Sequence, residues 1–89
     1  MSKIFKLLAQ KGAVEILENL EGKAMKYKEI EEIVGNPSTT SRRLSSLEEF
    51  GAVKRKVSSE KYRPVYYALT KEGKELLSIV REIGEKYKP

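Results

Sequence analysis

The 89-residue sequence contains no cysteine, no histidine, no tryptophan and no aspartate, so all 13 of its acidic residues are glutamates. Without cysteine the chain can form no disulfide and offers no thiolate as nucleophile or metal ligand. Without histidine it lacks the most common general base, the most common metal ligand and the usual pH switch. These absences argue against a hydrolase, a zinc enzyme or a phosphoryl-transfer enzyme, and we expect no metal and no cofactor.

Long hydrophobic runs are also missing from the sequence. There is no stretch of 18 apolar residues, and the first ten residues contain no signal-peptide hydrophobic region. We therefore expect a cytoplasmic protein without membrane association. The length allows one small domain, residues 1–89, with a modest core of the kind that many small domains complete by dimerising.

Positive charge is present in excess, with a net charge of +5. Residues 1–37 and 68–89 are nearly balanced, whereas residues 38–67 contain a cluster of basic residues: Arg42, Arg43, Lys54, Arg55, Lys56, Lys61 and Arg63. Such a cluster is either an ordinary solvated surface or a binding surface for a polyanion such as nucleic acid. Its position in the fold has to decide between the two.

The apolar spacing of the N-terminal third predicts three short helices. The first covers residues 2–10 and ends before Gly12, and the second begins at Ala13 and is stopped by Gly22 in the manner of a C′ glycine. Residues 23–27 form a loop or a short strand, and residues 28–34 form the third helix.

A longer helix is predicted over Pro37–Phe50. Asn36 is suited to cap it, since its side chain can accept from the free amides of the first turn, and proline fits the first helical position. A contact between Asn36 and a phosphate is the alternative. The buried side of this helix is expected to be a stripe formed by Thr40, Leu44 and Leu47. The short turn before it makes this segment a helix-turn-helix.

The periodicity changes to two after Gly51. Val53, Arg55 and Val57 alternate with Lys54 and Lys56, and Val65–Leu69 alternates in the same way, so the two segments predict a two-stranded hairpin. Thr70 then caps a final helix. The fold class is mainly α with a small β-hairpin, a winged helix-turn-helix with the order helix-helix-helix-wing-helix.

Three stretches of the sequence resemble winged-helix regulators of the HxlR and MarR kind: Ala13–Leu20 with Met25–Ile30, Ser41–Val53, and Arg63–Leu77. The last is the most specific, because its Val-x-Tyr-x-Leu-Thr-x-x-Gly pattern is similar to the second wing strand and final helix of the HxlR type. The resemblance implies a homodimeric DNA-binding transcriptional regulator. Several such relatives sense oxidants or electrophiles through a cysteine, and the lack of cysteine excludes that chemistry here.

The predicted outer face of the 37–50 helix carries small hydroxyls and arginines. On a wheel with 100° per residue, one arc of about 140° holds Ser38, Thr39, Arg42, Arg43 and Ser46. Such a face suits the major groove, where early residues of a recognition helix meet base edges. The alternative is an ordinary exposed face, but serine and threonine are poor helix formers and are rarely chosen for solubility alone. Either arginine could be the one that contacts a base.

The predicted hairpin, residues 53–69, is a second basic surface, with Lys54, Lys56, Lys61 and Arg63. These cations would lie on the phosphate backbone or in the minor groove. The alternative is that they protect an edge strand from aggregation. Tyr27 and Tyr67 are expected in the core, and Tyr62 either touches a sugar or packs on the wing.

The sequence as a whole favours a dimeric, sequence-specific regulator of double-stranded DNA. Residues 1–11 and 71–89 are expected to be dimerisation helices, although they could instead pack on each other within a monomer. Repression is favoured because the chain holds no separate activation domain. A nonspecific architectural DNA-binding protein and a protein-interaction winged helix are the alternatives, and no small-molecule effector is assigned.

Overall fold

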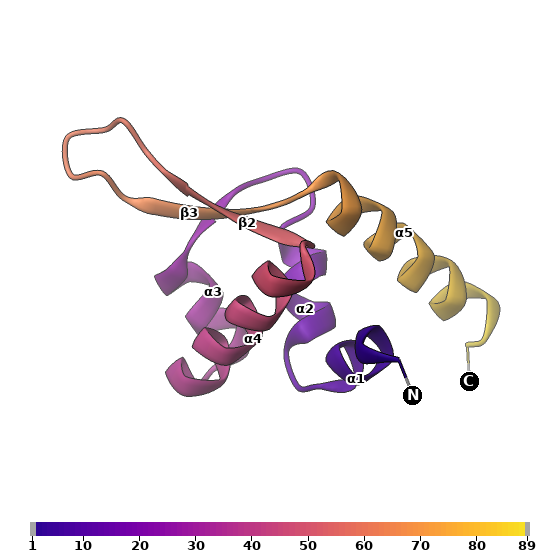
Figure 1. Ribbon diagram of the computed structural model, residues 1–89. Helices are drawn as coiled ribbons and strands as arrows, with labels where there is room; N and C mark the ends of the chain where they lie inside the picture. The colour runs from indigo at the N-terminus through magenta and orange to yellow at the C-terminus, as the bar shows by residue number, and fades with distance from the viewer. Residues whose placement is uncertain (1, 89) are drawn as a thin grey trace.

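The computed structural model describes residues 2–88 and has the predicted order of elements (Figure 1). They are α1 (Lys3–Ala9), α2 (Ala13–Asn19), β1 (Met25–Lys26), α3 (Tyr27–Val34), α4 (Pro37–Phe50), β2 (Val53–Val57), β3 (Val65–Leu69) and α5 (Lys71–Lys86). The structure confirms the mainly α fold with a small β-hairpin, the winged helix-turn-helix.

The helices α1 to α4 form one body from which two elements project (Figure 1). The β2–β3 hairpin extends from one side as the wing, and α5 runs off on the other side, where both chain ends lie. The sheet is antiparallel with the order β1-β3-β2, and Met25 and Arg55 both pair with Tyr67. Residues 23–27, predicted as either a loop or a short strand, therefore contain the two-residue strand β1, which joins the predicted hairpin as the third strand of the sheet.

The hydrophobic core is centred on α2. Its Ile16 and Leu17 are almost fully buried, as is Leu20 just after it, and they pack with Ile30 of α3 and Leu47 of α4. Each such side chain contributes about 1.5–3 kcal/mol by leaving water. The core therefore fixes α3 and α4, the two helices of the helix-turn-helix, against a common support.

The end of α2 lies one residue before its predicted place, because a C′ glycine at Gly22 puts the last helical residue at Leu20 and the helix ends at Asn19. The side-chain amide of Asn19 donates to the backbone oxygen of Glu15 at 2.8 Å. One carbonyl near the helix end, that of Ile16, accepts from the backbone amide of Leu20 at 3.0 Å. Leu20 is then buried as the cap residue, and Gly22, with φ of 77°, lies in the following turn.

The bounds of α4 agree with the prediction. Asn36 accepts from the backbone amide of Thr39 at 2.9 Å, which confirms its role as cap. Thr40 is fully buried, and its hydroxyl donates to the backbone oxygen of Asn36 at 2.8 Å. Leu44 and Leu47 complete the buried stripe, so the opposite side of α4 faces outward.

The Leu-Thr-x-x-Gly pattern at the start of α5 has a structural cause. The hydroxyl of Thr70 donates to the backbone oxygen of Gly51 at 2.5 Å and accepts from the amide of Gly73 at 3.0 Å. Gly73 is buried so tightly that a Cβ atom there would lie 2.0 Å from the backbone oxygen of Ala52. The pattern therefore joins α5 to the end of α4.

The second half of α5 is held differently. Arg81 donates to the carboxylate of Glu21 at 2.5 Å, and this hydrogen bond raises the pKa of the guanidinium above its usual value. Beyond Leu77, no residue of α5 is buried. None of the helices in residues 2–88 has the length and hydrophobicity that a bilayer-spanning segment needs.

Candidate nucleic-acid interface

The outward face of α4 consists of short polar side chains and one arginine. Its exposed polar members in the first three turns are Ser38, Ser41, Arg42 and Ser45. The predicted residues Thr39, Arg43 and Ser46 are only half-exposed and lie on the flank of the helix. Ser41 and Ser45 were not predicted, because the arc chosen on the wheel was centred on that flank. An arc of the same width centred opposite the buried stripe would have included Ser45, whereas Ser41 lies just beyond its edge.

Arg42 and Arg43 have different surroundings. The Nε of Arg43 donates to the backbone oxygen of Lys11 at 2.9 Å, in the turn between α1 and α2. Arg42 makes no hydrogen bond within residues 2–88 and is exposed. The two arginines border a shallow hollow of about 530 Å³ that is otherwise lined by Gln10, Ser41, Ser45 and Ser46. Every residue that lines this hollow has a polar or charged side chain, as suits a surface that meets base edges and phosphates.

Tyr27 connects the core to this outward face. Its ring is half-buried against the core, as predicted. Its hydroxyl lies 2.9 Å from the backbone oxygen of Pro37 and 2.8 Å from the Oγ of Ser41. The first residue of α3 is thus bonded to the first and second turns of α4.

The wing is more exposed than its alternation suggests. Val53 is the only buried residue of β2, while Lys54, Arg55 and Lys56 are all exposed. β2 is an edge strand of the sheet, and beyond Val53 both of its faces meet solvent, whereas β3 stays paired with β1 at Tyr66 and Tyr67. Arg55, which alternation assigned to the inner face, therefore adds a cation that the prediction of the site had missed.

The tip of the wing carries Lys61 and Arg63, and both are exposed. The loop is closed by hydrogen bonds from Ser58 to Pro64 and from Arg63 to Glu60, both at 2.9 Å between backbone atoms. Arg63 has φ of 46°, a left-handed conformation that costs a non-glycine residue about 1–2 kcal/mol. At the tip of the wing the positively charged Arg63 therefore occupies a backbone conformation that only glycine adopts without strain. Tyr62 is 86% exposed and is not packed on the wing.

The charges along α4 are arranged with the helix dipole. The first turn contains no acidic residue, and the first glutamate of the helix is Glu48 in the last turn. The free amides at the N-terminus add partial positive charge, so this end of α4 attracts anions. Residues 2–88 contain no group of three or more acidic, histidine or cysteine side chains placed to hold a metal ion.

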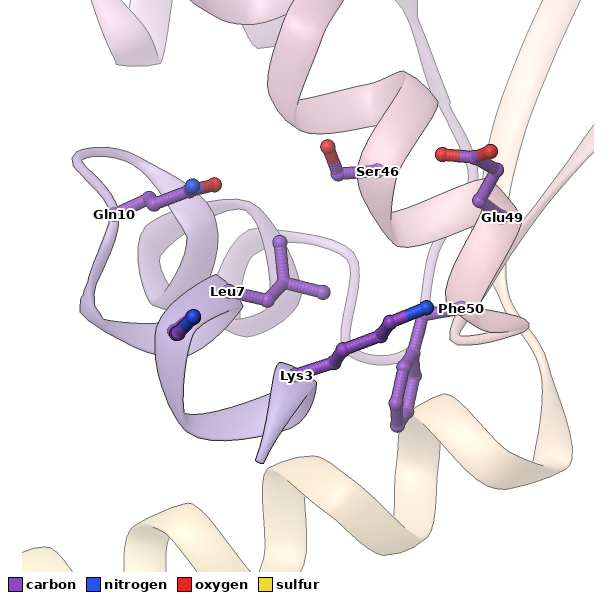
Figure 2. A pocket seen from close by; sticks show the side chains of 7 residues that line it. Lys3, Leu7, Gln10, Ser46, Glu49 and Phe50 are labelled. Carbon is purple, nitrogen blue, oxygen red and sulfur yellow. The ribbon is translucent and has the colours of Figure 1, made fainter. Parts of the chain in front are cut away.

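A groove of about 480 Å³ separates α1 from the C-terminal half of α4 (Figure 2). It is lined by Lys3, Lys6, Leu7, Gln10, Ser46, Glu49 and Phe50. In Figure 2 the side chain of Lys3 extends toward the end of α4, and the ring of Phe50 points toward α5. Phe50 is 46% exposed, so an apolar side chain is open to solvent at this end of α4.

Comparison with known proteins identifies the family. The profile of the HxlR-like helix-turn-helix family matches residues 7–88. The chain belongs to the HxlR-like helix-turn-helix family. This HxlR-like protein is therefore a DNA-binding transcriptional regulator and not an enzyme. No curated protein sequence matches it.

Solved structures similar to the HxlR-like protein include the reduced form of the transcriptional regulator YodB from B. subtilis. That chain is 27% identical with a TM-score of 0.84, over 96% of this chain and 89% of YodB. A possible HxlR family transcriptional factor from Thermoplasma volcanium is 20% identical with a TM-score of 0.80, and the match covers 96% of this chain and 78% of that chain. The homodimeric winged helix-turn-helix DNA-binding domain of Mb0332 from Mycobacterium bovis is 22% identical with a TM-score of 0.76, and the match covers 93% of this chain and 76% of that chain. The last two share its fold.

Proposed function

We propose that this protein is a homodimeric, sequence-specific repressor that inserts α4 into the major groove of duplex DNA. The observation that carries the proposal is the exposed face of α4, which combines serine hydroxyls with Arg42 and has no acidic residue before Glu48. Small side chains let the helix backbone approach the bases, and an arginine can grip guanine or a phosphate in bidentate fashion.

The site residues divide between base and backbone contacts in this proposal. Ser38 and Arg42 face the bases, while Thr39, Arg43 and Ser46 lie on the flank toward the phosphates. The bond of Arg43 to Lys11 occupies only Nε, so its terminal nitrogens stay available for a phosphate. On the wing, the cations that meet the backbone or the minor groove are Lys54, Lys56, Lys61 and Arg63, joined by Arg55.

The proposed dimer is supported by apolar side chains that the fold leaves uncovered. Phe5 of α1 is 57% exposed, and Ile79 and Ile83 of α5 are 54% and 51% exposed. The two helices are not each other's main partners, because α1 packs on α2 and α4, whereas α5 packs on α2 and β3. We assign residues 1–11 and 71–89 to an interface between two copies, in line with the homodimeric Mb0332 domain.

A dimer of this kind would repress transcription by occupying promoter DNA. We place this action in the cytoplasm, where a cell without a nucleus keeps its DNA. No effector is needed for that action. Two-fold symmetry would present two copies of α4 to half-sites one helical turn apart, about 10–10.5 base pairs between centres.

The test is selection of bound DNA from a random duplex pool, followed by competition with unrelated duplexes. We expect an enriched, two-fold symmetric sequence that unrelated DNA displaces only at large excess. Equal competition by unrelated duplexes would instead favour a nonspecific architectural protein. A lack of duplex binding even at low salt would favour a winged helix that binds proteins.

A further inference from the structure

The hydroxyl of Tyr27 belongs to a hydrogen-bonded chain that ends on the DNA-facing side of α4. It lies 2.9 Å from the backbone oxygen of Pro37 and 2.8 Å from the Oγ of Ser41. A phenol has one hydrogen to donate, a serine hydroxyl has one, and a backbone carbonyl has none. The number of hydrogens therefore limits how the three oxygens can be bonded.

Only one arrangement makes both contacts into hydrogen bonds. The oxygen of Pro37 can only accept, so the Tyr27 hydrogen must point to it. The contact between Tyr27 and Ser41 then needs a hydrogen from Ser41, because the phenol has no second one to give. Ser41 is left with its hydrogen directed into the protein and with lone pairs directed outward.

Ser41 is exposed and lines the polar hollow beside Arg42 and Ser45. An exposed serine usually rotates its hydroxyl to suit its partner, and so it donates or accepts with little preference between bases. The bond to Tyr27 removes that freedom. At this position α4 presents a hydrogen-bond acceptor.

We propose that Tyr27 is a specificity-determining residue, which orients Ser41 to accept a hydrogen bond from the exocyclic amine of adenine or cytosine. In the major groove adenine N6 and cytosine N4 are donors, whereas guanine O6 and thymine O4 are acceptors. The oriented Oγ of Ser41 can accept from the amines of adenine and cytosine, whereas it repels the carbonyl oxygens of guanine and thymine. This inference rests on the proposed function, since it needs α4 in the major groove.

The ring of Tyr27 and its hydroxyl have separate roles in this scheme. The ring packs against the core and holds the start of α3. The hydroxyl contributes the orientation of Ser41. Tyr27→Phe keeps the ring and removes only the hydrogen-bonding atom, so it frees the Ser41 hydroxyl to rotate without opening the core.

The experiment repeats the random-pool selection with the wild-type chain and with Tyr27→Phe, Ser41→Ala and the double variant. Ser41→Ala identifies the base pair that Ser41 contacts, since the preference there is lost. We expect Tyr27→Phe to relax the preference at that same base pair, so that guanine or thymine becomes tolerated. One neutral hydrogen bond corresponds to a change of roughly 2- to 12-fold in discrimination. The double variant should match Ser41→Ala alone.

Tyr67→Phe is the matched control. Tyr67 is another half-buried tyrosine packed against the core, and its hydroxyl has no hydrogen-bonding partner within residues 2–88. Its removal should leave every base preference unchanged, and thermal unfolding of each variant shows that the fold is kept.

Two results would overturn the inference while leaving the proposed function intact. One is an unchanged base preference in Tyr27→Phe, and the other is a uniform loss of affinity at all base pairs. If the wild-type chain enriches no sequence at all, the proposed function and the inference both fail, and this outcome is distinct from the other two.

Discussion

Arg42 and Arg43 are adjacent in the sequence, but one is free in solvent and the other is bonded to the body of the protein. Arg43 donates from Nε to the backbone oxygen of Lys11 and is half-buried. A hydrogen bond from a charged group contributes about 1.5–3 kcal/mol where solvent is excluded, and less at a partly exposed site such as this one. The sequence alone shows two equivalent basic residues, because the turn that meets Arg43 lies 32 positions away.

We expect Arg43→Ala to lower the free energy of unfolding by about 1 kcal/mol, because the bond to Lys11 and the packing of the side-chain stem are lost. Arg42→Ala, the matched control, should change it by less than about 0.5 kcal/mol, as is usual for exposed sites. Urea unfolding at one pH and salt concentration measures both. Equal effects of the two substitutions would show that Arg43 is not held as the structure has it.

At the scale of elements, the predictable features are those set by neighbouring residues. The cap at Asn36, the stripe of Thr40, Leu44 and Leu47, and the glycine after α4 fix that helix from local sequence. The exposure of Arg55 depends on how the strand sits in the fold, which local sequence does not contain. The alternating pattern correctly predicted strand β2, but it could not show that the side chains on both faces of this strand are exposed after Val53.

The junction between α4 and α5 gives a sharp test of packing. We expect Gly73→Ala to destabilise the protein by about 3 kcal/mol or more, because its Cβ would lie 2.0 Å from a backbone oxygen that cannot move freely. Gly84→Ala, in the same helix with nothing within 4 Å of its Cβ, should stabilise it by about 0.5–1 kcal/mol. Thermal unfolding compares the two variants, and a harmless Gly73→Ala would contradict the junction.

The wing should contribute to DNA affinity through phosphates alone. Replacing Lys54 and Lys56 by alanine should reduce the magnitude of the slope of log binding constant against log salt concentration by about 2, since each phosphate contact contributes about 0.9 to that slope. Base preferences should stay unchanged. The control replaces Lys23 and Lys28, exposed lysines outside the wing and the proposed dimer interface, which removes the same charge. An equal change of slope in both variants would argue against a wing that contacts DNA.

At the scale of the whole molecule, the shape separates two surfaces. The wing extends on one side of the helical body and α5 on the other (Figure 1), along a molecule that measures 46 × 25 × 23 Å. The sequence predicted apolar surfaces on residues 1–11 and 71–89, and the fold adds Phe50 at the end of α4 and Val57 and Tyr62 of the wing to the exposed apolar residues.

We expect the wild-type chain to sediment with about twice the 10.2 kDa mass of one chain. Ile79→Glu combined with Ile83→Glu should yield a monomer, because two charges cannot be buried unpaired in an apolar interface. Val57→Glu with Tyr62→Glu, which replaces exposed apolar residues of the wing, should leave the dimer intact. Sedimentation equilibrium gives the masses. A monomeric wild type, or a dimer that survives the α5 substitutions, would contradict the proposed interface.

The central claim is that the outward face of α4 binds DNA, and the most direct measurement compares two variants of equal charge on the selected duplex. Arg42→Ala with Arg43→Ala should weaken binding by about 1–3 kcal/mol for the contact to a base, and by more if a phosphate contact is also lost. Lys23→Ala with Lys28→Ala, exposed lysines outside α4, the wing and the proposed dimer interface, should bind almost as tightly as the wild type at the same salt concentration and with folding verified. If the arginine variant binds as well as the lysine variant, α4 is not the recognition helix.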